Sequence, residues 1–143
     1  MTRSRTHQPG GIRILLAEDN LVNQRVALFL LTKSGHTVDV ASNGAEAVEL
    51  FARFRHQLIF MDAQMPEMDG YEATQAIRLM ETDPPRAVIV ALTALAMAGE
   101  RERCLEAGMD DYLSKPIQVD TFHELLKRWL RMVEQRRANS PPS

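Results

Sequence analysis

Chemically active side chains follow four short apolar runs of the sequence. They comprise three carboxylates, one hydroxyl and one ammonium group, and they belong to Glu18, Asp19, Asp62, Thr93 and Lys115. The carboxylates would repel one another in a small space, and at least one would stay protonated unless a cation were present. Mg²⁺ binds to one or two carboxylates, a backbone carbonyl and a phosphate oxygen. The set therefore predicts a site for a cation and a phosphoryl group.

Each of these residues has an assignable part in phosphoryl transfer, which depends on positioning and charge neutralisation. Asp62 would be the nucleophile and form an acyl phosphate. Mg²⁺ held by Asp19 and Asp62 would offset charge on the phosphoryl oxygens. Lys115 and Thr93 would contact the remaining oxygens. Taken singly, each residue has a commoner use, such as a helix cap, a loop hydroxyl or a surface lysine. Together they follow four of the five apolar runs, and this combination favours the phosphoryl site.

The runs themselves predict the elements that position these groups. Nearly continuous apolar runs at 12–17, 58–61 and 87–92 are typical of strands that are buried on both faces, whereas 37–41 and the short run around Leu113 are expected at the edges. Helical spacing predicts helices over Leu21–Ser34, Ala45–Phe54, Tyr71–Met80, Ala98–Ala107 and Val119–Gln135. Alternating strands and helices indicate an α/β fold with a parallel sheet covered on both faces. Such sheets bind ligands beyond the carboxyl ends of their strands, where the active side chains lie.

Length and composition fit one domain. The chain has 143 residues, and we expect a domain over 11–135, a disordered lead at 1–10 and a disordered tail at 136–143. The net charge of −2 disfavours nucleic acid as a partner, and no apolar run is long enough to span a membrane. The single cysteine, Cys104, forms no internal disulfide, is expected in the core and suits the cytoplasm.

Four motifs resemble the receiver domain of two-component response regulators. They are LLAEDN at 15–20, MDAQMPEMDG at 61–70, ALTA at 91–94 and DYLSKP at 111–116, and the resemblance covers about residues 11–131. The stretches EDNLVNQ and MDAQMPEMDGYEAT are most similar to receiver modules of hybrid sensor histidine kinases, which suits an excised module. The resemblance implies a flavodoxin-like (βα)₅ fold, a doubly wound five-stranded parallel sheet in the order 2-1-3-4-5.

The resemblance also implies a role for each matched position. Asp62 corresponds to the phosphoacceptor, and Thr93 and Lys115 to the hydroxyl and the lysine of the family pattern. The implied Mg²⁺ ligands are Asp19, Asp62, the backbone carbonyl of Gln64 and, through water, Glu18. Tyr112 matches the aromatic that turns inward when Thr93 moves onto the phosphoryl group, and the Lys115–Pro116 peptide bond is expected to be cis.

The implied function is that of a phosphorelay receiver. A histidine kinase or a histidine phosphotransfer domain would donate a phosphoryl group from phosphohistidine to Asp62. The face formed by 97–107, 111–114 and 119–131 would then change and control a protein target or an attached domain. We expect neither nucleic acid nor membrane contact by this domain, and a cytoplasmic location, including as a module of a membrane-bound sensor kinase.

Two other functions remain open at this point. A pure binding module would leave the acidic cluster vestigial, and a magnesium titration would distinguish it. An aspartate-nucleophile phosphatase needs a second Asp two residues after the nucleophile, where this chain has Gln64. We therefore expect no enzyme activity beyond self-phosphorylation and slow self-dephosphorylation, with Gln64 and Leu95 tuning the phosphoryl lifetime.

Overall fold

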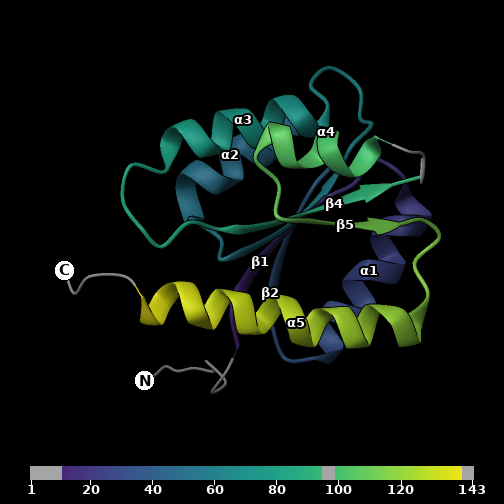
Figure 1. Ribbon diagram of the computed structural model, residues 1–143. Coiled ribbons are helices and arrows are strands. Elements are labelled where there is room, and N and C mark those ends of the chain that lie inside the picture. The colour runs from purple at the N-terminus through teal and green to yellow at the C-terminus, as the bar shows by residue number, and fades with distance from the viewer. Residues whose placement is uncertain (1–10, 95–98, 140–143) are drawn as a thin grey trace.

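A computed structural model describes residues 11–94 and 99–139 of the chain. Within this part, five parallel strands alternate with five helices (Figure 1). The strands are β1 (Arg13–Ala17), β2 (Thr37–Ala41), β3 (Leu58–Asp62), β4 (Val88–Thr93) and β5 (Asp111–Ser114). The helices are α1 (Leu21–Lys33), α2 (Gly44–Phe54), α3 (Gly70–Met80), α4 (Glu100–Ala107) and α5 (Val119–Ala138). The order β2-β1-β3-β4-β5 confirms the predicted fold class and the two predicted edge strands.

Helices cover the sheet on both faces, which is why its central strands read as continuous apolar runs. In Figure 1, α2, α3 and α4 lie on one side of the sheet, and α1 and α5 lie on the other. One core cluster packs between the sheet and α2–α4, around Phe51, Met61 and Ile77. The second packs against α1 and α5, where Trp129 meets Phe60 edge-on with ring centroids 5.3 Å apart. Cys104 is buried, as predicted.

Side-chain caps fix where α1, α2 and α3 begin. Asn20 accepts a hydrogen bond from the backbone N–H of Asn23, and Asp69 and Glu72 form a reciprocal capping box at the start of α3. The end of α5 differs from the prediction, because the helix continues past Gln135 to Ala138. Arg136 explains the extension, since its guanidinium reaches across to Asp110 and holds the last turn against the sheet.

Within residues 11–94 and 99–139, two peptide bonds are cis, Lys115–Pro116 and Pro84–Pro85. The first has the geometry that the family resemblance implies, and the second had no signal in the sequence. Among the described helices, none combines the length and the apolar character that crossing a membrane requires. Outside the described residues lie the predicted beginning of the fourth helix at Ala98, Leu95, the lead at 1–10 and residues 140–143 of the tail predicted at 136–143. Residues 136–138 of that predicted tail belong to α5.

Candidate functional site at the carboxyl ends of the strands

The parallel register brings the predicted side chains to one edge of the sheet. Asp62 is the last residue of β3 and pairs with Leu92, which is adjacent to Thr93 at the end of β4. The backbone N–H of Lys115 donates to the carbonyl of Thr93 at 2.8 Å. The ends of β3, β4 and β5 are thereby held side by side.

Three carboxylates gather at this edge. Each of Glu18, Asp19 and Asp62 offers an oxygen atom, and these atoms lie within 4.8 Å of one another. Glu18 and Asp62 are buried, whereas Asp19 is exposed. Among the residues that the structure describes, this is the one such group of three or more potential ligands. Hard oxygen donors in this number suit Mg²⁺, so the donor set fits the predicted metal.

Lys115 supplies the neighbouring positive charge. Its Nζ lies 2.8 Å from Glu18 Oε1 and 2.9 Å from Asp62 Oδ2. Glu18 Oε1 is fully buried and, within the described part of the chain, accepts no hydrogen bond of good geometry although it faces the ammonium group. One ammonium group cannot neutralise three carboxylates, so the site keeps an excess of negative charge that a divalent cation would offset.

Burial shapes the ionisation of this cluster. The pKa of Asp62 is raised above its usual range, first by burial and then by the nearby Glu18, against the opposing pull of Lys115 and the backbone N–H of Gln64. For Lys115, burial acts to lower the pKa, but the contacts with Glu18 and Asp62 outweigh it and the pKa is raised. The ammonium group therefore stays charged. Because burial disfavours the ionised form of Asp62, a bound cation would stabilise this carboxylate.

The loop after β3 holds Asp62 from the backbone side. The N–H of Gln64 donates to Asp62 Oδ1 at 3.0 Å, and Gln64 and Asp19 line the same surface hollow. A Cβ at Gly70 would lie 2.2 Å from the carbonyl oxygen of Asp62, so only glycine permits this approach of α3 to the end of β3.

Thr93 directly follows Leu92, the sheet partner of Asp62, and it has a partner that the sequence did not reveal. Thr93 is buried, and its Oγ1 donates to Glu100 Oε1 at 3.5 Å. The hydroxyl of Tyr71 donates to the same carboxylate oxygen. Tyr112 is partly buried and packs against the core cluster on the α2–α4 side. Tyr71 and Glu100 are far apart in the sequence and carry no shared motif, so local pattern could not pair them.

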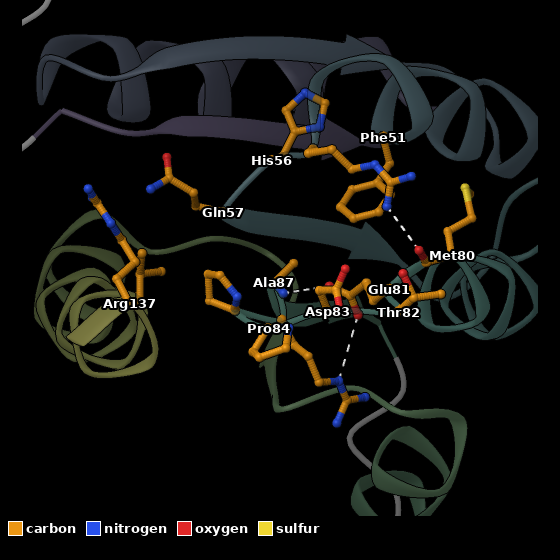
Figure 2. Close-up of a pocket in the computed structure, with 14 residues that line it drawn as sticks. Phe51, His56, Gln57, Met80, Glu81, Thr82, Asp83, Pro84, Ala87 and Arg137 are labelled. Atoms are coloured by element: carbon orange, nitrogen blue, oxygen red, sulfur yellow. Dashed lines mark hydrogen bonds and ion pairs between the residues drawn. The ribbon is translucent and has the colours of Figure 1, made fainter. Parts of the chain in front are cut away.

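A separate hollow of about 400 Å³ lies at the opposite end of the sheet. Figure 2 shows residues around it that come from α2, the segment before β4 and the end of α5, including Phe51, Glu81 and Arg137. Glu81 already accepts hydrogen bonds from Arg78 and from the backbone of Ala87. None of the residues predicted to take part in phosphoryl transfer lines this hollow.

The family model that describes the response regulator receiver domain matches residues 14–127. Hybrid signal transduction histidine kinase B of Dictyostelium discoideum is 46% identical over 129 residues, and Histidine kinase 1 of Arabidopsis thaliana is 43% identical over 155 residues. Both alignments cover 82% of this chain, but they span only 7% and 13% of these relatives.

Solved structures give the same comparison in three dimensions. The receiver domain of a sensor histidine kinase from Pseudomonas aeruginosa PAO1, with a magnesium ion coordinated in its active site cleft, is 45% identical, with a TM-score of 0.76 over 85% of this chain and 98% of that chain. A second match comes from the co-crystal structure of the Saccharomyces cerevisiae histidine phosphotransfer signalling protein Ypd1 and the receiver domain of the response regulator Ssk1. It has a TM-score of 0.80 and 33% identity, over 85% of this chain and 90% of that chain.

Proposed function

Because this chain belongs to the response regulator receiver domain family, we propose that it is a phosphorelay receiver in which Asp62 accepts the phosphoryl group. One observation carries the proposal: Asp62 is at once part of the carboxylate cluster and in contact with Lys115 at 2.9 Å. A carboxylate between a cation site and an ammonium group is placed for attack on an anionic phosphoryl group.

The transfer makes one bond and breaks another. A carboxylate oxygen of Asp62 attacks phosphorus, and the P–N bond to the imidazole of the donor phosphohistidine breaks. The electron pair of that bond returns to the imidazole nitrogen, which can then take up a proton from solvent. Lys115 then forms an ion pair with one phosphoryl oxygen, and the hydroxyl of Thr93 donates a hydrogen bond to another.

Mg²⁺ is the metal that these residues would hold. Its proposed ligands are Asp19, Asp62 and the carbonyl of Gln64, with Glu18 acting through water. When bound, the ion neutralises charge on the carboxylates and on the transferring group. Support comes from the close grouping of the three carboxylates and from the magnesium ion in the Pseudomonas relative.

The decisive experiment is labelling with acetyl phosphate and Mg²⁺. The wild-type protein should gain one phosphoryl group by intact-protein mass spectrometry, and D62N should lose at least about 100-fold in labelling rate, because an amide oxygen is a poor nucleophile. D83N is the matched control, since Asp83 is exposed and makes no ion pair among the described residues. Labelling of D62N at the wild-type rate would disprove the assignment of Asp62.

We propose that the phosphodonor is a histidine kinase or a histidine phosphotransfer domain that docks on α1. Leu21, Val22, Val26 and Phe29 are exposed apolar residues that lie along one side of this helix. The patch begins two residues after Asp19, next to the carboxylate cluster. The yeast match, which contains a histidine phosphotransfer protein together with a receiver domain, supports this choice of partner. V22K should weaken phosphotransfer from such a donor while leaving labelling by acetyl phosphate unchanged.

For the output, we propose a protein target on the face formed by α4, β5 and α5. A hollow of about 490 Å³ on this face is lined by Tyr112, Leu125 and Arg128, together with Lys115 itself. K115A should uncouple phosphorylation from the change at Tyr112, which NMR of the tyrosine ring would detect. An unaltered ring response in K115A would contradict this route of switching.

The proposed module acts in the cytoplasm and works on itself, without turning over other substrates. Its single cysteine is unpaired and buried, as suits a reducing compartment. Gln64 stands where an acid would be needed to protonate the leaving group of a phosphomonoester. Hydrolysis of a free phosphomonoester above the rate of D62N would contradict this part of the proposal.

A further inference from the structure

Two hydroxyl groups converge on one carboxylate oxygen beside the proposed phosphorylation site. Tyr71, near the start of α3, and Thr93, at the end of β4, both donate to Oε1 of Glu100, the first residue of α4. Glu100 therefore connects three elements through a single atom. It lies outside all four motifs that define the family resemblance.

The two hydrogen bonds differ in strength. Tyr71 donates to Glu100, and burial together with Glu100 raises the pKa of the Tyr71 hydroxyl, which keeps it a donor. The guanidinium carbon of Arg103 lies 4.2 Å from the centre of the Tyr71 ring and braces it. The contact from Thr93 is 3.5 Å long, at the outer limit of a hydrogen bond. When Thr93 moves away from Glu100, Glu100 can remain in place on Tyr71.

We infer that Glu100 is a positioning residue that holds the Thr93 hydroxyl in its unphosphorylated position and opposes phosphorylation of Asp62. This inference rests on the proposed function of Asp62 and Thr93. A phosphoryl group on Asp62 brings strong acceptor oxygens that compete with Glu100 for the same hydroxyl. The balance between the two acceptors sets how readily Thr93 shifts, since a ligand moves an equilibrium only by its differential interaction with the two states.

Glu102, on the same helix, is a control that distinguishes the proposed role of Glu100 from a purely structural one. Glu100 and Glu102 both lie in the first turn of α4, where an acidic side chain favours the helix dipole. Glu102 is exposed and makes no hydrogen bond or ion pair among the described residues. If Glu100 acted only by stabilising the start of α4, E102Q would reproduce the effect of E100Q.

The test measures the rate of labelling by acetyl phosphate in E100Q and E102Q. The glutamine keeps the shape of the side chain and its contact with Tyr71 but removes the charge that strengthens the bond from Thr93. We expect E100Q to be labelled roughly threefold to tenfold faster than wild type, the range that corresponds to the net contribution of one hydrogen bond. E102Q should match wild type.

A double-mutant cycle shows whether Glu100 acts through Thr93. T93V removes the hydroxyl and keeps a branched side chain of similar size, and in this background E100Q should bring no further gain. An equal gain with and without the hydroxyl would refute the inference, because the charge alone would then be responsible. The inference would also be refuted if E100Q were labelled at the wild-type rate while its unfolding free energy equalled that of wild type. Failure of the wild-type protein itself to be labelled would instead refute the proposed function of Asp62.

Discussion

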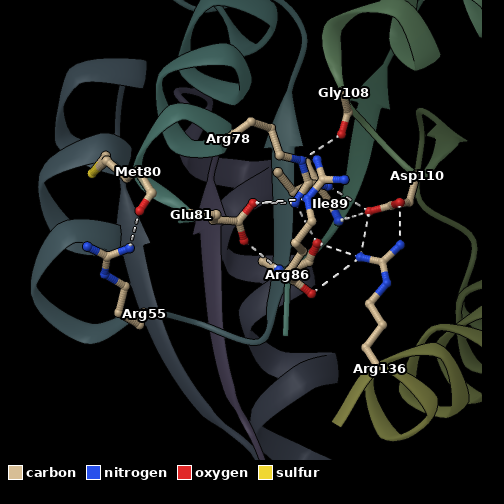
Figure 3. Close-up of polar contacts among 10 residues, drawn as sticks. Arg55, Arg78, Met80, Glu81, Arg86, Ile89, Gly108, Asp110 and Arg136 are labelled. Atoms are coloured by element: carbon tan, nitrogen blue, oxygen red, sulfur yellow. Dashed lines mark hydrogen bonds and ion pairs between the residues drawn. The ribbon is translucent and has the colours of Figure 1, made fainter. Parts of the chain in front are cut away.

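The two ends of the sheet both hold clustered charges, yet they balance them differently. At the carboxyl ends of the strands, three carboxylates share one ammonium group, that of Lys115. At the amino ends, Arg78 and Arg136 both bind the carboxylate of Asp110, as Figure 3 shows. Arg78 also donates to the carboxylate of Glu81, and the carbonyl oxygen of Ala87 accepts hydrogen bonds from both arginines.

The difference separates a structural cluster from a reactive one. In the Asp110 cluster every charge has an opposite charge or a hydrogen-bond partner, which ties α3, β4, β5 and α5 together (Figure 3). In the carboxylate cluster the charges do not match, and the surplus is of the sign that attracts a metal cation. Burial of matched charge gives rigidity, whereas burial of unmatched charge gives affinity for a ligand.

The largest expected effect comes from breaking the matched cluster. D110A removes the acceptor that Arg78 and Arg136 share, and leaves Arg78, which is only 10% exposed in its side chain, with Glu81 as its remaining carboxylate partner among the described residues. We expect the free energy of unfolding to fall by about 3 kcal/mol, as for other disrupted buried ion pairs. Urea denaturation would measure it, with D83A as the exposed control. A loss no larger than that of D83A would mean that the cluster is not structural.

The next effect is steric and lies at the reactive end. G70A would place a methyl group 2.2 Å from the carbonyl oxygen of Asp62, so that the backbone must shift. We expect a loss of about 2 kcal/mol in unfolding free energy and, in addition, weaker Mg²⁺ binding because Asp62 moves. Calorimetric titration with Mg²⁺ would report the second effect. Unchanged Mg²⁺ affinity in a destabilised G70A protein would show that the loop adapts without displacing Asp62.

A smaller effect, opposite in sign to that of D110A, is expected when the unmatched cluster loses a charge. D19N relieves repulsion among carboxylates whose oxygens lie within 4.8 Å of one another. In the presence of EDTA, the unfolding free energy should rise by up to about 1 kcal/mol. Mg²⁺ affinity should fall at least about tenfold, since one ligand is lost. A D19N protein that is less stable without metal would contradict the view that this end is under electrostatic strain.

The smallest effect is a pH dependence that arises at the amino end of β3. Burial lowers the pKa of His56 below its ordinary 6.5, although Asp39 accepts a hydrogen bond from its Nε2 at 2.7 Å. Nδ1 of His56 is buried and has no hydrogen-bond partner in the described part of the chain. A proton added to this nitrogen would therefore have no hydrogen-bond acceptor. The unfolded chain therefore binds more protons than the folded one just below pH 6.5, and stability should fall as pH drops from 7.5 to 5.5.

Denaturation curves at several pH values would measure the slope of the unfolding free energy against pH. H56Q should flatten it, while H123Q should not, because His123 is exposed. Some slope should remain in H56Q, since burial also lowers the pKa of His36. An H56Q protein with the full wild-type slope would assign the pH dependence to other groups.

The sequence predicted most of the fold and the members of the carboxylate cluster, because both depend on local patterns. Apolar runs and helical spacing located the elements, and the rule for parallel sheets placed Asp62, Thr93 and Lys115 together. The contacts of Tyr71 with Glu100 and of Arg78 with Asp110 were missed. Each joins residues about 30 positions apart through one side-chain atom pair, and such pairs leave no periodic trace in a single sequence.

Glu18 gives the site a consequence for recognition. One of its carboxylate oxygens faces Lys115, and the other accepts the backbone N–H of Asn20 at 3.0 Å. Asn20 in turn caps α1, the helix with the exposed apolar patch. A single side chain thus belongs both to the carboxylate cluster and to the start of the helix on which we propose that the donor docks. We therefore expect a partner bound on α1 to distinguish the metal-bound from the metal-free cluster without any large motion.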